Sequence, residues 1–137
     1  MFSTVRNRLA VYMTKPFARF ARKALIREAD LWEAALLANA GLIDADLGGG
    51  VIKQRIARTG EGKSGGARTI ILFRFKGRAV FVFGFEKKDV GNIKANELEA
   101  FKELADVILG YSDNEIAKRV ADGALIEVCP PEEGGNA

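Results

Sequence analysis

The sequence contains no histidine and a single cysteine, Cys129. Without histidine, no imidazole can act as a general base, so Ser-His and Cys-His nucleophiles are excluded. One cysteine cannot form an internal disulfide, and with no histidine beside it a thiolate–imidazole zinc site is excluded as well. We therefore expect no metal and no other cofactor. A reducing compartment, the cytoplasm, is the simplest setting for such a chain.

Long apolar runs are also missing. No stretch of about 18 apolar residues occurs, which excludes a transmembrane helix, so we expect no membrane partner. The N-terminal segment has too short an apolar stretch for a signal peptide, and a second methionine, Met13, precedes the first helical pattern. In a chain of 137 residues, 48% hydrophobic, this predicts a dispensable extension at 1–12, one domain with one core at 13–128, and a flexible tail at 129–137.

Charge is distributed unevenly along the chain. Residues 1–50 hold 7 Lys/Arg and 5 Asp/Glu, residues 51–94 hold 11 and 3, and residues 95–137 hold 3 and 10. The three segments therefore carry net charges of +2, +8 and −7 within a total of +3. A middle segment this positive indicates a polyanionic partner, of which nucleic acid is the usual one.

Hydrophobic periodicity predicts an α+β fold. Helical spacing occurs around Phe17–Leu25, Asp30–Gly41, Leu98–Gly110 and Ser112–Gly123, the last with a Ser112/Glu115 capping box. Strand-like runs occupy Val51–Arg58, Arg68–Phe75 and Ala79–Glu86, and Ala124–Val128 is a candidate extra edge strand. Because no β-α-β unit occurs, we expect a three-stranded antiparallel sheet with two helices before it and further helices after it.

Side-chain alternation in these strands predicts which residues share a face of the sheet. In the first strand Lys53 and Arg55 point away from the apolar isoleucines. In the third strand, Phe81, Phe83 and Phe85 are predicted to lie together on one face.

The segment Ala57–Ser64 fits a relaxed Walker A pattern, with alanine in place of the first glycine. That motif requires a helix directly after the phosphate-binding loop. Here Lys63 and Ser64 are followed by two glycines and a strand-like run, so we expect a glycine-rich hairpin loop and no nucleotide hydrolysis. Arg58, Lys63 and the loop amides are instead candidates for contacts with a nucleic-acid backbone.

Basic residues stand out at Lys53 and Arg55 on one strand, at Arg68 opening the next, and at Lys87 and Lys88 ending the third. An antiparallel sheet could bring Lys53, Arg55, Arg68 and Lys88 together on one open face. Lysines at strand edges also protect sheets from aggregation, and Lys87 could serve that purpose alone. Arg68 opens an apolar strand directly after the glycine-rich loop, where edge protection gives no reason for an arginine.

Four segments carry a resemblance to a known family: Lys15–Lys23, Gly48–Arg55, Gly62–Ile71 and Phe83–Asp89. In these segments the chain resembles the RelE/HigB-like toxins of type II toxin–antitoxin systems, within the RelE/ParE superfamily. The subgroup that the chain resembles has a long glycine-rich loop between the first two strands, and the resemblance spans residues 13 to 128. No single motif is diagnostic; their order and spacing carry the match.

The resemblance implies a metal-independent endoribonuclease that cleaves mRNA on the ribosome by attack of a 2′-OH on the adjacent phosphate. By resemblance, Lys53 and Arg55 lie near the 2′-OH and phosphate, Arg68 clamps the phosphate, and Lys88 completes the catalytic set. The further RNA-binding residues would be Arg58, Lys63, Lys87 and Lys94. The chain departs from the family at Ala67, where an aromatic residue is common, and at Lys94, where several members have a tyrosine. These departures concern the assignment of the general acid and base.

The resemblance also implies partners. These are mRNA, the ribosome, and a cognate antitoxin with a helix-turn-helix DNA-binding part, so that operator DNA is contacted only through the antitoxin complex. Two alternatives remain open at this point. The first is a ParE-like inhibitor that binds DNA gyrase and needs no catalytic residues, and the second is an RNA-binding module without catalysis.

Overall fold

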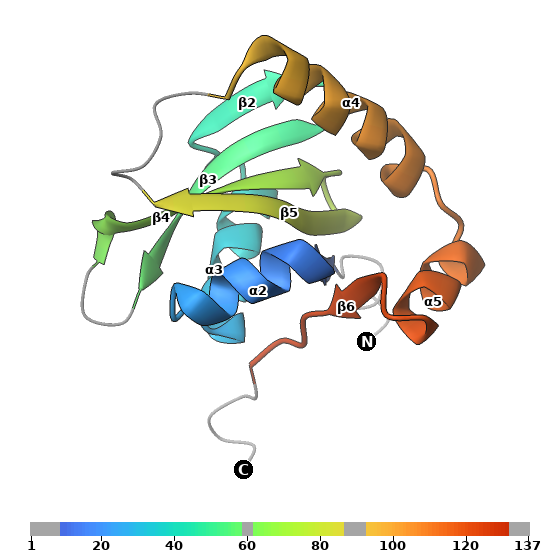
Figure 1. Ribbon diagram of the computed structural model, residues 1–137, viewed down its shortest axis with the longest axis horizontal. Helices are drawn as coiled ribbons and strands as arrows, with labels where there is room; N and C mark the ends of the chain where they lie inside the picture. Colours follow the sequence, from blue (N-terminus) through green and yellow to red (C-terminus); the bar gives the residue numbers. More distant parts are fainter. Residues whose placement is uncertain (1–8, 59–61, 87–92, 132–137) are drawn as a thin grey trace.

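The computed structural model describes residues 9–58, 62–86 and 93–131, which form helices packed on both faces of one mixed β-sheet (Figure 1). The elements in chain order are β1 Ala10–Thr14, α2 Lys15–Lys23, α3 Glu28–Asn39, β2 Ala45–Gly48, β3 Val51–Arg58, β4 Gly62–Phe73, β5 Arg78–Glu86, α4 Ala95–Leu109, α5 Asp113–Ala121 and β6 Leu125–Glu127. None of these helices combines the length and the apolar character that crossing a bilayer requires. The α+β class predicted from the sequence is confirmed.

The sheet has six strands in the order β2-β3-β4-β5-β1-β6, so the prediction of three strands is wrong. The three predicted strands correspond to β3, β4 and β5, and the candidate edge strand near the C-terminus is confirmed as β6. The prediction of a purely antiparallel sheet is wrong as well, because β1 pairs parallel to β5. Both unpredicted strands, β1 and β2, have only five and four residues. Such short runs carry little periodicity, and distant pairing decides their state.

Strand β1 includes part of the segment that we set apart as an N-terminal extension. Leu9 and Val11 are 4% and 1% exposed, and Ala10 pairs with Arg78 at the start of β5. On its other side β1 pairs with β6. Residues 10–12 therefore belong to the sheet, where β1 lies between β5 and β6.

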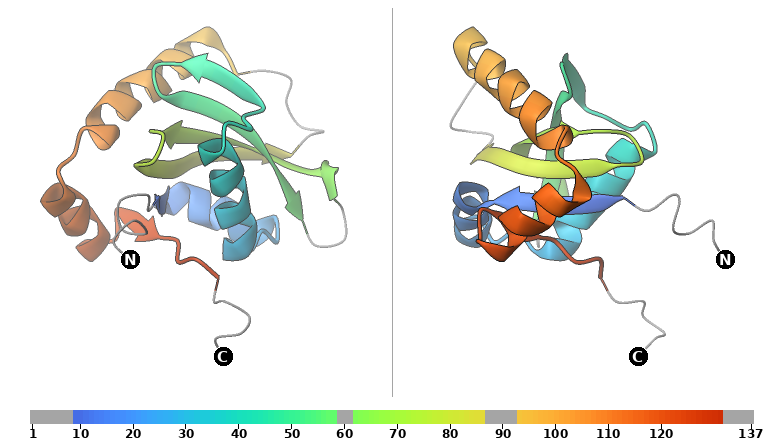
Figure 2. Two further views of the ribbon diagram at one scale, coloured as in Figure 1. Left: turned by 180° about the vertical axis from the view of Figure 1, so that it is seen from behind. Right: turned by 90° about the vertical axis from the view of Figure 1, so that its right-hand side faces the viewer.

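Each face of the sheet buries its own apolar cluster. Helices α2 and α3 lie on one face and α4 on the other, as all three views show (Figures 1 and 2). The α2/α3 face includes Ile52, Ile56 and Phe81. The α4 face includes Val51 and Ile70. Because side chains alternate along a strand, the odd-numbered residues of β3 and the even-numbered residues of β4 point toward the α4 face.

Local sequence signals explain where two of the helices begin. The Thr14 hydroxyl accepts a hydrogen bond from the backbone N–H of Phe17 at 3.4 Å and caps α2. The predicted capping box of α5 is confirmed, since Ser112 Oγ accepts from the Glu115 N–H and the Glu115 carboxylate accepts from the Ser112 N–H. Each cap satisfies backbone donors that have no partner within the helix.

Helix α3 starts at Glu28, two residues before the predicted start. Asp30 is its third residue, and its carboxylate accepts hydrogen bonds from the backbone N–H of Arg27 at 2.9 Å and from the Arg27 guanidinium at 2.8 Å. Burial raises the pKa of Asp30, but the hydrogen bonds and charge of Arg27 outweigh it, so that this pKa lies below its usual value. Asp30 therefore acts inside the first turn of the helix as an anionic acceptor.

The three phenylalanines of β5 do not share a face, contrary to the prediction. Phe81 packs on Phe17 of α2, with ring centroids 5.3 Å apart, whereas Phe83 contacts Phe101 of α4 at 5.9 Å. The register explains the change: consecutive β4 residues, Ile70 and Ile71, pair with residues 83 and 81. This bulge inserts one residue and reverses the alternation. Phe83 and Phe85 consequently lie on the α4 face.

Strand β4 begins at Gly62, earlier than the predicted start at Arg68. Ala67 pairs with Ile56 of β3, so part of the predicted glycine-rich loop belongs to the β3–β4 ladder. No helix follows Ser64, as expected when the Walker A interpretation was rejected.

Candidate functional site

Three of the four predicted catalytic residues lie on the same face of neighbouring strands. Arg55 of β3 pairs directly with Arg68 of β4, and Arg68 pairs in turn with Phe85 of β5. Lys53 lies two residues before Arg55 on the same face, opposite Ile70. We call Lys53, Arg55 and Arg68 the basic patch. Its residues come from two different strands, and only the register of the β3–β4 pair brings them together.

The basic patch lies beside the part of the sheet that α4 covers. Helix α4 packs its Ala105 and Leu109 against residues such as Val51 and Ile70 of the α4 face. Lys53 is partly exposed, and the Arg55 side chain is 46% exposed. The basic patch is therefore accessible to a large ligand.

Arg68 is partly buried and has one fully buried side-chain atom. Its Nη1 atom is buried and, among the residues that the structure describes, has no hydrogen-bond partner. Leaving a buried donor unpaired costs about 1–3 kcal/mol, so such atoms in native proteins need an explanation. In addition, two arginines directly opposite each other in a sheet repel. An anionic ligand bound between Arg55 and Arg68 would satisfy the donor and offset the repulsion.

Aromatic side chains border the basic patch on the β5 side. Phe85 is 7% exposed and Phe83 is 42% exposed, and their ring centroids are 5.9 Å apart. An exposed aromatic ring next to a cluster of cations is a surface on which a nucleic-acid base can stack. The prediction that Phe83 and Phe85 share a face is confirmed, whereas Phe81, which we placed with them, lies on the other face.

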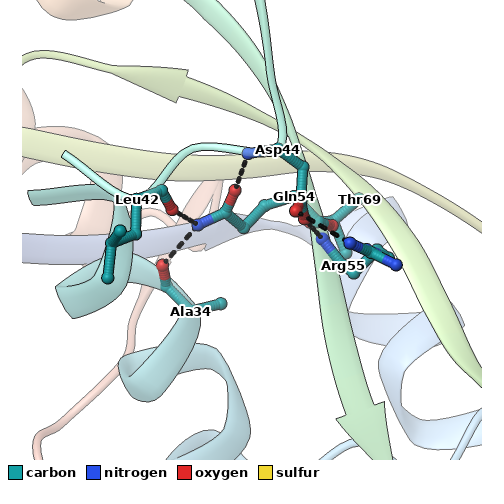
Figure 3. A network of polar contacts seen from close by, with 6 residues as sticks. All are labelled: Ala34, Leu42, Asp44, Gln54, Arg55 and Thr69. Carbon is teal, nitrogen blue, oxygen red and sulfur yellow. Dashed lines mark hydrogen bonds and ion pairs between the residues drawn. The ribbon is translucent and has the colours of Figure 1, made fainter. Parts of the chain in front are cut away.

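A carboxylate that we did not predict contacts the basic patch. Asp44, in the connection between α3 and β2, accepts a hydrogen bond from the backbone N–H of Arg55 at 2.6 Å. Its other oxygen lies 3.4 Å from Arg55 Nη2. Figure 3 shows how Gln54, which is 2% exposed, joins this connection to α3. No motif marked Asp44 or Gln54 in the sequence, because their partners lie in other elements.

Gln54 uses both ends of its amide. Its Nε2 donates to the carbonyls of Ala34 at 3.2 Å and Leu42 at 3.0 Å, and its Oε1 accepts from the Asp44 N–H at 2.9 Å. The hydroxyl of Thr69 on β4 donates to the Gln54 carbonyl at 2.9 Å. A buried polar group is tolerated when it is hydrogen-bonded in this way, and such a network makes the local geometry rigid.

For the other five predicted site residues, the structure describes Lys94 in full, the backbone of Arg58 and Lys63, and neither Lys87 nor Lys88. Lys87 and Lys88 lie outside the described residues. The backbone of Arg58 ends β3, and that of Lys63 lies near the start of β4. Lys94 is exposed and precedes α4, where its backbone N–H donates to the Glu97 carboxylate at 2.9 Å.

The two tyrosines lie at the other end of the fold and make interactions of their own. The guanidinium of Arg119 lies 5.0 Å from the ring centroid of Tyr111, and its hydrogen bond with Tyr111 raises the pKa of Arg119. Tyr12 lies on β1, where burial and then the nearby Glu127 raise its pKa. In the described ranges, no three side chains of His, Cys, Asp or Glu type lie close enough together to hold a metal ion.

An accessible basic patch on the sheet of a small α+β domain is the arrangement expected of a surface that contacts a polyanion. Comparison with known families identifies it further: residues 9–128 match the family described as the RelE toxin of the RelE/RelB toxin–antitoxin system. The chain belongs to this family and is the toxin of a toxin–antitoxin system, with an antitoxin as its partner. A search of curated proteins found no match. The family match includes β1, which begins at Ala10.

Proposed function

We propose that this toxin is a metal-independent endoribonuclease that cleaves mRNA, in the cytoplasm and on the ribosome. Toxins of the RelE family are generally ribonucleases. The observation that carries the proposal is the pairing of Arg55 with Arg68 on an accessible face, with Arg68 Nη1 buried and lacking a partner in the described part of the chain. A phosphate group supplies both the negative charge and the acceptor oxygens that this arrangement requires.

The proposed reaction is an internal transfer at phosphorus. The 2′-oxygen of the nucleotide before the scissile bond attacks the adjacent phosphorus and loses its proton to a base. The 5′-oxygen of the next nucleotide leaves and takes up a proton, which yields a 2′,3′-cyclic phosphate and a 5′-hydroxyl end. Neither an oxidant nor a metal is needed to balance this step. The protein's task is to align the 2′-oxygen with the leaving oxygen and to stabilise the charge of the phosphorane.

Each residue of the basic patch has a role in this proposal. Arg68 clamps the phosphate, because a guanidinium can bind two oxygens at once. Arg55, opposite it, stabilises the charge that develops on the phosphorane. Lys53, two residues before Arg55 on the same face, lies near the attacking 2′-OH. Lys88 would complete the catalytic set.

Further cations would bind the RNA backbone away from the scissile bond. We assign this role to Arg58, Lys63, Lys87 and Lys94. Each phosphate contact adds affinity that falls as the salt concentration rises, without specifying a sequence.

We further propose that the antitoxin carries a helix-turn-helix part, so that operator DNA is bound only by the complex. An acidic antitoxin segment over the basic patch would neutralise the +8 charge of residues 51–94. Exposed charge contacts are screened within about 8–10 Å at physiological salt, so such a complex should weaken sharply as salt rises.

The test is expression of the Arg68→Ala variant, with Arg19→Ala as a control of the same charge change. Arg19 is an exposed residue of α2, on the face opposite the basic patch. We expect the wild type and Arg19→Ala to arrest growth and to produce new mRNA 5′ ends, and Arg68→Ala to do neither. Full toxicity of Arg68→Ala would contradict the proposal. If that toxicity came with inhibited DNA gyrase, it would favour a ParE-like inhibitor.

A further inference from the structure

The carboxylate of Asp44 holds Arg55 at two points. Its Oδ2 accepts from the backbone N–H of Arg55 at 2.6 Å, and its Oδ1 lies 3.4 Å from the guanidinium Nη2. The backbone N–H is available because β2 pairs with β3 only as far as Lys53. The Asp44 carboxylate thus takes the place of a strand partner for the backbone N–H of Arg55. A guanidinium has five N–H donors, so this contact leaves donors of Arg55 free for a phosphate.

Asp44 is itself held in place. Its backbone N–H donates to Gln54 Oε1 at 2.9 Å, and the same amide binds the carbonyls of Ala34 and Leu42 (Figure 3). The position of the carboxylate is therefore set by α3 and β3 together. Since Gln54 is 2% exposed, this arrangement is formed before any ligand arrives.

The negative charge of Asp44 lies beside a pair of like charges. Arg55 and Arg68 are opposite each other in the ladder, and like charges in such a pair repel. A long arginine side chain that is 46% exposed can relieve the repulsion by turning toward solvent. A fixed carboxylate beside Arg55 opposes that movement.

We propose that Asp44 is a positioning residue, which keeps the Arg55 guanidinium next to Arg68 so that both can bind the scissile phosphate. This inference rests on the proposed ribonuclease activity. Asp44 acts through Arg55 and touches no RNA. Removal of Asp44 then lowers the rate of cleavage while RNA affinity is kept or increased, because a negative charge leaves a polyanion site.

The test measures the single-turnover cleavage rate of ribosome-bound mRNA and, separately, the affinity for an mRNA with a 2′-O-methyl group at the cleavage site. Asp44→Asn keeps an oxygen for the Arg55 N–H but removes the ion pair. We expect its cleavage rate to fall by about 10- to 100-fold, the usual effect of a small misplacement of a reacting group. We expect Asp44→Glu, which restores the charge, to recover part of the rate. In an Arg55→Ala background, Asp44→Asn should cause no further loss.

Asp46→Asn is the matched control, because Asp46 is an exposed residue of β2 whose carboxylate accepts a hydrogen bond from the nearby Gly48 N–H at 3.0 Å. It should cleave at the wild-type rate. Three results would overturn the inference and leave the proposed function intact. These are a cleavage rate in Asp44→Asn that equals the wild-type rate, an equal loss of rate in Asp46→Asn, and losses from Asp44→Asn and Arg55→Ala that add up in the double variant. A wild-type protein that cleaves no mRNA would instead refute the proposed function, and the inference with it.

Discussion

Replacement of Arg68 by methionine should stabilise the free protein while it removes the toxin's activity. Methionine keeps an unbranched apolar stem of similar length but carries no charge and no N–H group. The substitution therefore eliminates the buried Nη1 donor that lacks a partner among the described residues, and it removes one member of the Arg55/Arg68 pair. Both features oppose folding in the absence of a ligand.

The magnitude follows from these two contributions. An unsatisfied buried donor costs about 1–3 kcal/mol, and a like-charge pair across strands costs about 0.2–1 kcal/mol. Because Arg68 is only partly buried, part of its charge remains hydrated, and we expect a net gain of about 1–2 kcal/mol in the free energy of unfolding. At about 2.1 cal/mol/K of unfolding entropy per residue, this raises Tm by about 3–7 °C.

Urea unfolding in a low-salt chloride buffer measures this difference directly. Arg19→Met on the opposite face is the control and should change the unfolding free energy by no more than about 0.5 kcal/mol. Addition of sulfate should stabilise the wild type and reduce the gap, because an anion that binds only the folded protein contributes RT ln(1 + [L]/Kd). The reasoning is refuted if Arg68→Met is less stable than the wild type, or if sulfate stabilises both proteins equally.

Other predictions concern the fold, the glycine-rich segment and the partner. Asp30→Asn should lower the free energy of unfolding by about 1 kcal/mol at pH 7, as the loss of a helix cap does. Because the pKa of Asp30 is lowered in the fold, its stabilisation is present above the unfolded pKa of about 3.9 and disappears as pH falls through the folded pKa. Urea titrations at pH 7 and pH 3 check it, and an equal difference at both would contradict it. Gly84→Ala should lower Tm because a Cβ at this position meets the Phe20 ring, and the Phe20→Leu variant should tolerate it better in the same melting experiment. Equilibrium dialysis should detect no ATP or GTP binding at millimolar concentrations, whereas measurable affinity that depends on Lys63 would restore the Walker A interpretation. A complex with the antitoxin should dissociate as salt rises, and one that survives 1 M salt would show that apolar burial dominates the interface.

The local features of the fold were predictable because they depend on residues close together in the sequence. The α5 capping box depends on a few consecutive side chains. The same holds for Lys53 and Arg55, whose shared face follows from the alternation of one strand. Arg68 was predicted as a phosphate ligand from its position after the glycines and from the family resemblance.

The tertiary structure alone decided how these features meet. The β3–β4 register places Arg55 opposite Arg68, and a slip of one residue would send every side chain of one strand to the other face. A bulge separates Phe81 from Phe83, and no local signal marks it, since it depends on the partner strand. Asp44 reaches the basic patch only because Gln54 ties its connection to α3. The sequence by itself determined the helices, the strands β3, β4 and β5 and the cations on these strands, while the pairing of distant segments added β1 and β2 and determined which cations share a site.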